Sequence, residues 1–468
     1  KILDNIRDAI HSFIVRTFIV PLVTRFFKPM VDGTTEQLTV EFTTLARSVS
    51  FGGQRKSAEN NNEGNQVTLY IDNPIHFCWL LLLDQKIGLG EAYMDGDWRA
   101  VPGIKAFLTC LIRAKRLCIE YYERSSIYSG EKAAMRTGKR GPRSLSFSIA
   151  HFLLNKFISF LRAIVASYNY ICHRIRDNTI MRSRKNISEH YDLGNEMFQL
   201  FLDPSMTYSC ALFENVDSAL PENDDNKELE EAQIRKVDSL IESLQLTPAD
   251  HVLEIGCGWG TAAIRAVQKY GCKWTGLTIS TEQLELAQGK IRDVGLEDKI
   301  ELKLLDYRLE EGTYTAIVSI EMIEAVGERF LPQYFSVLHD RLEKGGKAAI
   351  QAIVCPDAYY DRYCRSSDFI KKHIFPGGHL PSIGAIHRSL PKDDNDEVLF
   401  EVEMGKRMAK HYARTLDTWL STWNSKEKEI VRLGYSTTFH RKWQFYFGLC
   451  SSLFEYDHID VIQFTLNK

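Results

Sequence analysis

Three closely spaced glycines are the residues whose chemistry is easiest to interpret. They lie in the run 252–260 (VLEIGCGWG), where strand-forming residues precede the glycines and a helical pattern follows. Gly256 allows a tight turn, and Gly258 lets the backbone approach a ligand closely at the carboxyl end of a strand. The pattern is typical of a nucleotide-binding loop, and the alternative is a structural turn.

Two classes of cofactor use such a loop. A dinucleotide requires G-x-G-x-x-G and an acid at the end of the second strand. Position 261 is Thr, however, and no carboxylate follows that strand before Glu282. S-adenosylmethionine instead needs backbone contact for its amino-acid end, hydrogen bonds for its ribose and an edge for adenine. Suitable residues end the first three strands in order, and they are Gly256, Cys257 and Gly258, then Thr278, Ile279 and Gln283, then Asp306 and Tyr307. We therefore predict S-adenosylmethionine as the cofactor.

Strand-like and helical runs alternate through the second half of the chain. This alternation predicts an α/β fold with a doubly wound sheet. The runs are 252–255, 261–270, 274–279, 282–294, 300–305, 315–320, 331–342 and 348–353.

Composition narrows the class of protein. The 468 residues suffice for two or three domains, and a net charge of −3 argues against nucleic acid as a partner. Ten cysteines show no C-x-x-C pair, which favours free thiols in a reducing, cytoplasmic compartment. No run reaches the roughly 20 uninterrupted apolar residues of a membrane span. The strongest candidates are Phe13 to Phe27 and Phe152 to Tyr170. Arg16 and Pro21 interrupt the first, and Lys156 and Arg162 interrupt the second. The chain begins with Lys1 and not with methionine, so a targeting segment upstream of Lys1 stays an alternative.

We expect three regions along the chain. Residues 1–124 form a smaller, mainly helical α+β domain that faces lipid, with an amphipathic helix near its start and strands around the polar stretch 60–65. Residues 125–185 form a basic linker and an amphipathic helix, and residues 186–468 form the catalytic domain.

The segment from Lys132 to Lys185 carries twelve Lys or Arg residues, whereas Asp177 is its single acid. Apolar residues such as Phe152, Phe160 and Ile164 alternate with this charge. A basic amphipathic helix of this kind can lie on an anionic bilayer. The alternative is a helix that covers the catalytic domain or a partner in a homodimer, with its charges solvated.

The chain resembles the cyclopropane-fatty-acyl-phospholipid synthase and mycolic-acid cyclopropane synthase family over nearly all of 187–468. Residues 88–98 also look like the amino-terminal domain of the phospholipid-acting members. The matching stretches are 189–195 (EHYDLGN), 201–204 (FLDP), 208–210 (YSC), the glycine loop, 277–280 (LTIS) with Gln283, 323–327 (IEAVG), 375–378 (FPGG), 411–416 (HYARTL) and 459–464 (IDVIQF).

The resemblance implies a class I methyltransferase fold, with seven strands of which the last is reversed, and helical insertions that form an acyl tunnel. It implies methyl transfer from S-adenosylmethionine to a cis alkene of a membrane phospholipid, followed by proton removal and ring closure. An alkene is a poor nucleophile, so it must be aligned with the methyl group and kept from water. Methyl transfer to the alkene forms a carbocation, which the faces of aromatic rings can stabilise. Tyr412 fits this role better than Trp259, Phe369 or Phe375.

The family's proton acceptor is a bicarbonate ion, and the resemblance places five residues around it: Cys210, Glu324, Gln351, Ile353 and Tyr412. Tyr208 and Ser209, which precede Cys210, are expected to contact the cofactor. Each of these residues also has an alternative, purely structural interpretation. Cys210, for example, would be a buried free thiol, and Tyr412 would be an aromatic ring of the core. Glu321 is the rival carboxylate to Glu324.

The sequence departs from the bacterial pattern at two positions. Gln351 replaces a histidine, and Ala325 replaces another. Glutamine can hydrogen-bond an anion but does not carry a proton near neutral pH. Plant relatives look similar at these positions, which indicates a eukaryotic branch. The departures leave the double-bond position and ring closure open.

We expect a peripheral, membrane-associated enzyme. Two further hypotheses remain at this point. One is a methyltransferase that gives a methyl branch or that acts on a small amine. The other is a membrane-surface binding protein without catalysis, against which the intact Glu324 and Tyr412 argue.

Overall fold

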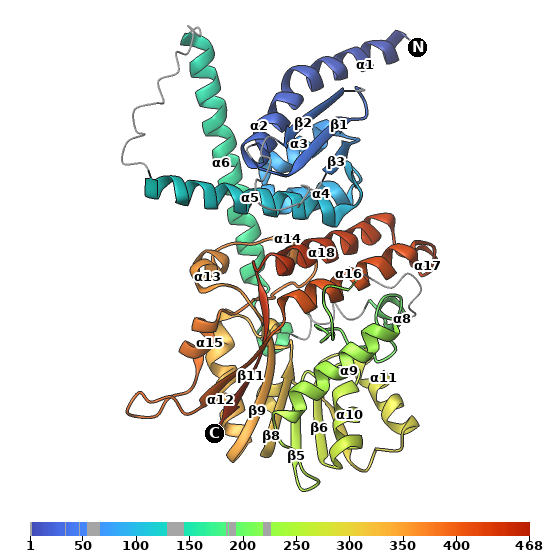
Figure 1. The fold of residues 1–468 in the computed structure, drawn as a ribbon, viewed down its shortest axis with the longest axis vertical. Helices are drawn as coiled ribbons and strands as arrows, with labels where there is room; N and C mark the ends of the chain where they lie inside the picture. The colour runs from blue at the N-terminus through green and yellow to red at the C-terminus, as the bar shows by residue number, and fades with distance from the viewer. Residues whose placement is uncertain are drawn as a thin grey trace. The chain divides into compact units, whose positions relative to one another are not determined.

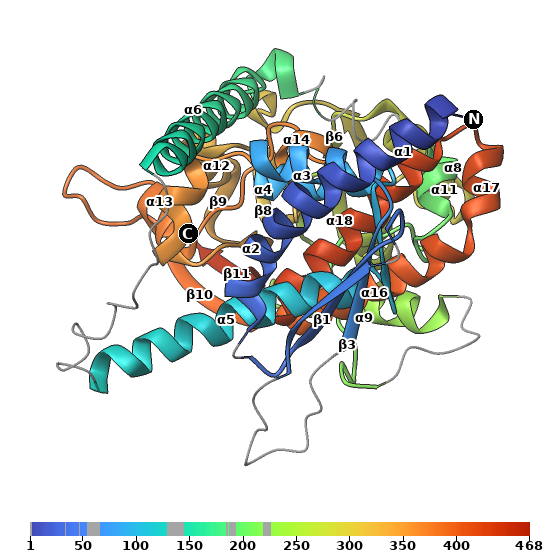
Figure 2. The same cartoon turned by 90° about the horizontal axis from the view of Figure 1, so that it is seen from above.

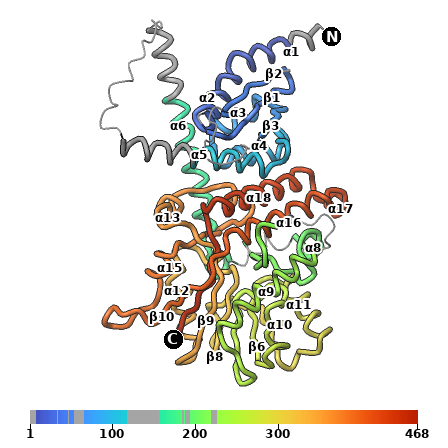
Figure 3. Tube along the Cα trace, viewed as in Figure 1, coloured from blue at the N-terminus to red at the C-terminus, as the bar shows by residue number. Residues whose placement is uncertain are grey.

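A computed structural model describes most of the chain (Figure 3). Three expected features lie outside it: the polar stretch 60–65, most of the linker 125–146 and positions 189–192 of the EHYDLGN stretch. The described residues are 2–32, 34–45, 47–53, 66–128, 145–183, 186, 193–218 and 226–468.

The chain divides into two compact units whose limits differ from the expected domains. One comprises Lys1–Asn169 with Ser436–Ser452, and the other comprises Tyr170–Tyr435 with Leu453–Lys468. The division therefore falls inside one helix, α6 (Leu145–Ile175), which Figure 2 shows as continuous. No local sequence pattern signals that 436–452 joins the first unit.

The first unit contains a four-stranded sheet in the order β2-β1-β3-β4. Alternate residues of β1, which are Leu38, Val40 and Phe42, are fully buried, as expected for a strand with one face on a core. Helical residues such as Phe107 are fully buried in the same unit. The elements are β1 (Gln37–Phe42), β2 (Arg47–Gly52), β3 (Gln66–Ile71), β4 (Trp98–Val101), α3 (Pro74–Leu83), α4 (Gln85–Met94) and α5 (Ile104–Tyr128).

The amino-terminal helix is amphipathic, as expected, and its buried side includes Val23, Phe27 and Val31. It continues from α1 (Ile2–Ile14) through the π-helical η1 (Val15–Ile19) into α2 (Val20–Val31). Arg16 and Pro21 interrupt the run of apolar residues, but they do not end the helix. The irregularity takes the form of a π turn, which re-routes backbone hydrogen bonds without ending the helix. Within the described residues, Asp8–Val31 is therefore long and apolar enough to cross a bilayer, by length and composition only.

The second unit is built on a seven-stranded sheet in the order β10-β11-β9-β8-β5-β6-β7. Pairs β5–β6, β5–β8, β6–β7 and β8–β9 are parallel, whereas β11 is antiparallel to β9 and β10. The last strand alone is thus reversed, which confirms the expected class I methyltransferase sheet. The strands are β5 (His251–Ile255), β6 (Lys273–Thr278), β7 (Ile300–Leu304), β8 (Tyr314–Ile320), β9 (Leu342–Val354), β10 (Glu401–Arg407) and β11 (Asp460–Asn467).

Helices cover both faces of this sheet, so it is doubly wound (Figure 1). One core joins the sheet to α12 and α15 and contains Tyr334 and Leu338. The other joins it to α9, α10 and α11 and contains Leu240 and Trp274. The helices of this unit are α8 (Asn195–Gln199), α9 (Lys227–Glu242), α10 (Thr261–Tyr270), α11 (Thr281–Asp293), α12 (Leu331–Arg341), α13 (Asp357–Cys364), α14 (Phe369–His373), α15 (Ile383–Ser389), α16 (Ala409–Ser425) and α17 (Glu427–Arg432), with 3-10 turns η2 (Tyr307–Leu309), η3 (Ile323–Ala325) and η4 (Glu328–Phe330). Helix α18 (Thr437–Glu455) belongs to the first unit as far as Ser452.

Candidate active site

The glycine turn joins β5 to α10 and has the backbone that its sequence predicts. Gly256, Gly258 and Gly260 all have positive φ, at 85°, 50° and 82°. A Cβ at Gly256 would lie 2.9 Å from the Met322 side chain, whereas one at Gly258 would meet nothing within 4 Å. The turn therefore exposes backbone at Gly258, where a ligand can approach closely.

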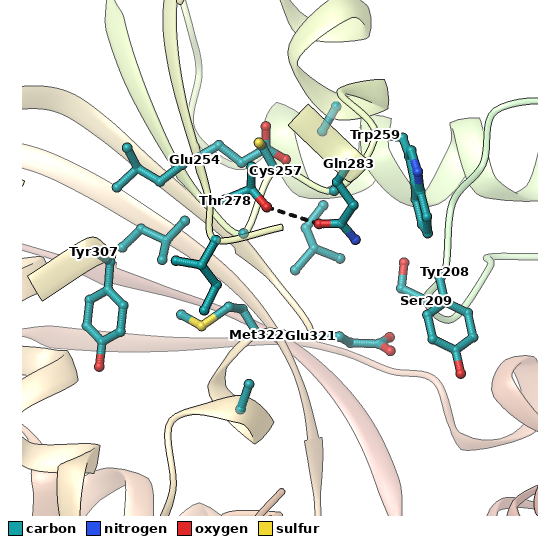
Figure 4. A pocket seen from close by; sticks show the side chains of 18 of the residues that line it. Tyr208, Ser209, Glu254, Cys257, Trp259, Thr278, Gln283, Tyr307, Glu321 and Met322 are labelled. Atoms are coloured by element: carbon teal, nitrogen blue, oxygen red, sulfur yellow. Dashed lines mark hydrogen bonds between the residues drawn. The ribbon is translucent and has the colours of Figure 1, made fainter. Parts of the chain in front are cut away.

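One cavity lies beside this turn, at the carboxyl edge of the sheet (Figure 4). All the residues expected to contact the cofactor line it. Their cofactor contacts stay a prediction, but their convergence on one cavity is a property of the fold. They are Tyr208, Ser209, Gly256, Cys257, Gly258, Thr278, Ile279, Gln283, Asp306 and Tyr307.

The end of β6 presents two linked polar side chains to the cavity. The hydroxyl of Thr278 donates a 3.0 Å hydrogen bond to Oε1 of Gln283 (Figure 4). Ser280 caps α11, because its hydroxyl accepts from the backbone amide of Gln283. The link leaves the amide nitrogen of Gln283 as a donor toward a ligand's hydroxyl groups.

The end of β7 holds an ion pair that the sequence did not predict. Arg308 approaches Asp306 to 2.6 Å, and both side chains are buried. Arg308 also donates to the hydroxyl of Ser183 at 3.2 Å and to the backbone carbonyl of Asn178 at 2.9 Å. Arg308 thus fixes the carboxylate of Asp306 and keeps its pKa below the usual range against the effect of burial.

Two buried charged residues, Lys236 and Glu254, also line the cavity, and the sequence did not single out either. Lys236 Nζ donates a 2.6 Å hydrogen bond to Oγ of Ser209. Burial raises the pKa of Glu254 to about 7, although its carboxylate accepts from the indole of Trp274 at 2.9 Å. Lys236 could have been identified from the sequence, because it is a lysine on the apolar side of the helix α9.

Glu321 is the centre of a polar network on the wall of the cavity. Its Oε1 accepts hydrogen bonds from the backbone amide of Cys210 at 2.8 Å and from Nε2 of Gln351 at 2.7 Å. Its Oε2 accepts from the hydroxyl of Tyr412 at 2.9 Å. Figure 4 shows the carboxylate extending to the side of the cavity formed by Tyr208 and Ser209.

Glu324 forms a separate contact. Its Oε1 accepts from the backbone amide of Ile353, and its Oε2 is buried without a hydrogen-bond partner among the described residues. Burial, together with the nearby charge of Glu321, raises the pKa of Glu324 to about 8.

The five expected ligands of one ion therefore divide into two groups. Cys210, Gln351 and Tyr412 meet at Glu321, whereas Ile353 pairs with Glu324. In the structure the five residues therefore have two centres, and their contacts with an ion stay a prediction. Glu321, and not Glu324, accepts from the three donors. Its backbone adopts the left-handed conformation (φ 49°) immediately after the end of β8, and this conformation places its side chain at the centre of the network.

Three strands and α16 hold this network in register. Gln351 on β9 lies beside Ile320 of β8 and Gln463 of β11. Nε2 of Gln463 donates a 3.0 Å hydrogen bond to Oε1 of Gln351, which turns the Nε2 of Gln351 toward Glu321. Gln463 falls within a matching motif, but the sequence assigned it no role.

The loop that carries Cys210 is attached to the first turns of α16. The amide of Ala211 donates to Oγ1 of Thr415 at 3.1 Å, and the amide of Phe213 donates to Nδ1 of His411 at 3.1 Å. These contacts explain the spacing of the HYARTL stretch, because the same helix presents Tyr412 to Glu321.

Aromatic rings line the region beside the network. Tyr208 lies 5.2 Å from Trp419 and 6.5 Å from Phe375, between ring centroids, and Phe198 lies 5.3 Å from Trp259. Trp259, one of the weaker candidates for stabilising the cation, lines the cavity, whereas Phe369 is buried against His373. The sequence did not single out Trp419.

The sheet, the exposed glycine turn and the ordered polar strand ends together define a class I S-adenosylmethionine-dependent methyltransferase. Comparison with known proteins narrows this class. The sequence model described as "Mycolic acid cyclopropane synthetase" matches residues 178–464. The chain belongs to that cyclopropane synthase family, which transfers methyl groups from S-adenosylmethionine to lipid acyl chains.

Two similar proteins come from Mycobacterium tuberculosis. A tuberculostearic acid methyltransferase is 37% identical over 399 residues, covering 85% of this chain and 83% of the relative. Cyclopropane mycolic acid synthase 3 is 34% identical over 292 residues, covering 60% of this chain and 96% of the relative. A crystal structure of a mycolic acid cyclopropane synthase with SAH and CTAB is 31% identical, with a TM-score of 0.54, and covers 61% of this chain and 98% of its own.

Proposed function

We propose that this enzyme adds a one-carbon unit from S-adenosylmethionine to a cis double bond of a phospholipid acyl chain and closes it into a cyclopropane ring. One observation carries the proposal. The carboxylate of Glu321, ordered by three donors, lines the same cavity as the glycine turn that would hold the methyl donor. A methyl donor and a base on one cavity are what alkylation followed by proton removal requires.

When bound, S-adenosylmethionine supplies an electrophilic methyl group. The residues of this chain hold the donor, keep water out and stabilise positive charge. Gly258 offers open backbone, and Gln283 offers an amide donor. The rings of Tyr208 and Trp259 line the cavity and provide electron-rich faces, which favour a cation.

The family resemblance implies a bicarbonate ion as the base, and the residues of this chain do not fit one. Its four expected donors are the amides of Cys210 and Ile353 and the side chains of Gln351 and Tyr412. Each already donates to a carboxylate of the chain itself. A bound bicarbonate would have to displace the carboxylate of Glu321 or stand beside it, and two like charges are unfavourable in a buried site. We therefore route no step through bicarbonate.

The phospholipid substrate and a peripheral membrane location are part of the same proposal. Helix α6 contains no Asp or Glu in its sequence, and among its side chains from residue 156 on, which the structure describes, five apolar ones are between 49% and 61% exposed. They are Phe157, Phe160, Ile164, Ile171 and Ile175, at spacings that place them along one stripe. A basic helix with such a stripe supports contact with an anionic, cytoplasmic membrane surface.

A second candidate product is a methyl-branched chain, because the relative that matches 85% of this chain is a tuberculostearic acid methyltransferase. Ring closure is redox-neutral and needs a base alone. A saturated branch needs a hydride as well, and Thr261 breaks the dinucleotide spacing of the glycine loop. On chemical balance, the ring is favoured for this chain acting alone. A small amine is a third candidate substrate.

The test is incubation of the full chain with S-adenosylmethionine and vesicles of a cis-unsaturated phospholipid, followed by mass spectrometry of the acyl chains. A gain of one methylene with no remaining double bond and no added hydrogen supports the ring. A product with two further hydrogens supports the branch, and methylation of added small amines without any lipid product would defeat the lipid proposal.

A further inference from the structure

The carboxylate of Glu321 occupies the position at which an exogenous anion would be bound. Its two oxygens accept three hydrogen bonds, which come from a backbone amide, a side-chain amide and a phenol. The donors arrive from three separate elements, namely the loop at Cys210, strand β9 and helix α16. Such a shell is a complete anion site, and the chain fills it with its own side chain.

Resting on the proposed function, we propose that Glu321 is the proton acceptor of the reaction and that this enzyme works without bicarbonate. Glu324 accepts from the amide of Ile353 instead of from these three donors, and it has the role of a neutral neighbour. The proposal rests on the placement of donors around Glu321 and on its position on the cavity wall.

The two carboxyl groups have different surroundings. Burial raises the pKa of Glu321, and the amide of Cys210, the cation of Lys236, Gln351 and Tyr412 act in the opposite direction. Glu324 has one donor from Ile353, and the charge of Glu321 adds to the effect of burial. When two neighbouring carboxyls differ in this way, one serves as base while the other stays protonated. The carboxylate with more donors is Glu321.

The backbone at Glu321 supports a specific role for its side chain. Its φ of 49° lies in the left-handed region, which costs a non-glycine residue about 1 kcal/mol or more. Its amide donates to the carbonyl of Gln351 at 2.8 Å, which holds this conformation. Glycine would adopt the same backbone without strain, so the glutamate side chain is retained at an energetic cost.

The chemical step balances without another reagent. The π electrons of the alkene form a C–C bond to the methyl carbon, and the C–S pair leaves with sulfur as a neutral thioether. A C–H bond of the transferred methyl then breaks, and its electron pair closes the ring on the cationic carbon. The proton passes to the Glu321 carboxylate, which becomes a neutral acid and releases the proton to solvent after the product leaves.

The first test uses Glu321→Gly, which keeps the backbone conformation and empties the donor shell. Turnover on cis-unsaturated phospholipid vesicles in CO₂-depleted buffer should fall by about a hundredfold or more, as for loss of a general base. Addition of millimolar bicarbonate should raise the turnover of Glu321→Gly at least about tenfold. Asp396→Gly is the matched control, because Asp396 also has positive φ (66°) and is exposed outside the cavity. It should show neither the loss nor the rescue.

Wild-type turnover should be the same with and without bicarbonate. A wild-type enzyme that stops in CO₂-depleted buffer would overturn the inference, as would a Glu321→Gly variant with full activity there.

A second readout does not depend on the lipid substrate. Binding of ¹³C-bicarbonate, measured by NMR, should be absent in the wild type and present in Glu321→Gly, with circular dichroism confirming that both are folded. Saturable binding to the wild type would overturn the inference whatever the substrate is. The wild type could give no lipid product in any buffer while bicarbonate binds to Glu321→Gly and not to the wild type. That result would defeat the proposed substrate but would support Glu321 as the group that fills the anion site.

Discussion

The hydroxyl of Tyr412 donates a 2.9 Å hydrogen bond to the carboxylate of Glu321, 91 residues away in the sequence. The bond connects the start of α16 to the end of β8, and it attaches a phenol to a carboxylate on the cavity wall. Neither residue acts alone. The phenol orders the carboxylate, and the carboxylate faces the space beside the glycine turn.

Replacement of Tyr412 by Phe should slow turnover about tenfold to a hundredfold, because a hydrogen bond to a charged group is worth about 1.5–3 kcal/mol. Affinity for S-adenosylmethionine, measured by calorimetry, should not change. The acid limb of the pH–rate profile should move to higher pH, because the hydroxyl lowers the pKa of Glu321. An unchanged profile would show that Tyr412 does not act through Glu321.

Gln463 is predicted to act as a positioning residue. Gln463→Leu removes the donor that orients the Gln351 amide, so that Nε2 is free to rotate away from Glu321. We expect kcat to fall about tenfold with KM little changed, since an unsatisfied buried amide costs about 1–3 kcal/mol. Gln463→Glu keeps an acceptor but loses the donor and should not rescue. A change confined to KM would indicate a different role.

Arg308→Met should destabilise the protein by about 3 kcal/mol, because it leaves the buried carboxylate of Asp306 without its partner. Urea denaturation measures the change. The double variant Asp306→Asn with Arg308→Met removes the uncompensated charge and should regain a large part of the loss. If the double variant is as unstable as the single one, the cost comes from lost packing and not from the buried charge.

The pKa of Glu324 predicts a pH dependence of stability. The folded protein holds this proton up to about pH 8, whereas the ordinary value is 4.5. Between these values the folded state binds more protons than the unfolded state, so the free energy of unfolding falls as pH rises. One proton contributes at most about 1.4 kcal/mol per pH unit. Glu324→Gln should flatten the curve over this window, and Glu343→Gln, on the exposed part of β9, should not.

The exposed stripe of α6 predicts membrane binding. The double variant Phe160→Glu with Ile164→Glu should weaken sedimentation with anionic phospholipid vesicles about tenfold or more, because it adds charge to an apolar face. Val431→Glu changes a similarly exposed apolar residue on α17 and serves as the control. Equal binding by the wild type and both variants would rule out the stripe as the contact.

The sheet of the second unit could be predicted from the sequence, because its elements are local. Strands β5, β8 and β9 contain short apolar runs, β7 alternates apolar and polar residues, and a helical pattern follows most of the strands from β5 to β9. The turn at Gly256 follows from three glycines whose backbone other residues rarely adopt. The cofactor residues were within reach for the same reason, since strand ends of a parallel sheet share one edge.

The polar network could be predicted only in part. Cys210, Gln351 and Tyr412 were identified by their motifs, but their common partner was not, because it depends on a left-handed residue after β8. The roles of Lys236 and Gln463 depend on contacts across 27 and 112 residues. No local period indicates such contacts, which arise only when the strands and helices have packed.

The most direct test of proton removal by Glu321 uses S-adenosylmethionine with a fully deuterated methyl group and vesicles of a cis-unsaturated phospholipid. We predict an acyl product whose added carbon has one deuterium fewer than the methyl group it came from, formed by the wild type without bicarbonate and lost in Glu321→Gly. An acyl product that keeps every deuterium would contradict proton removal from the transferred carbon, and with it the role of Glu321.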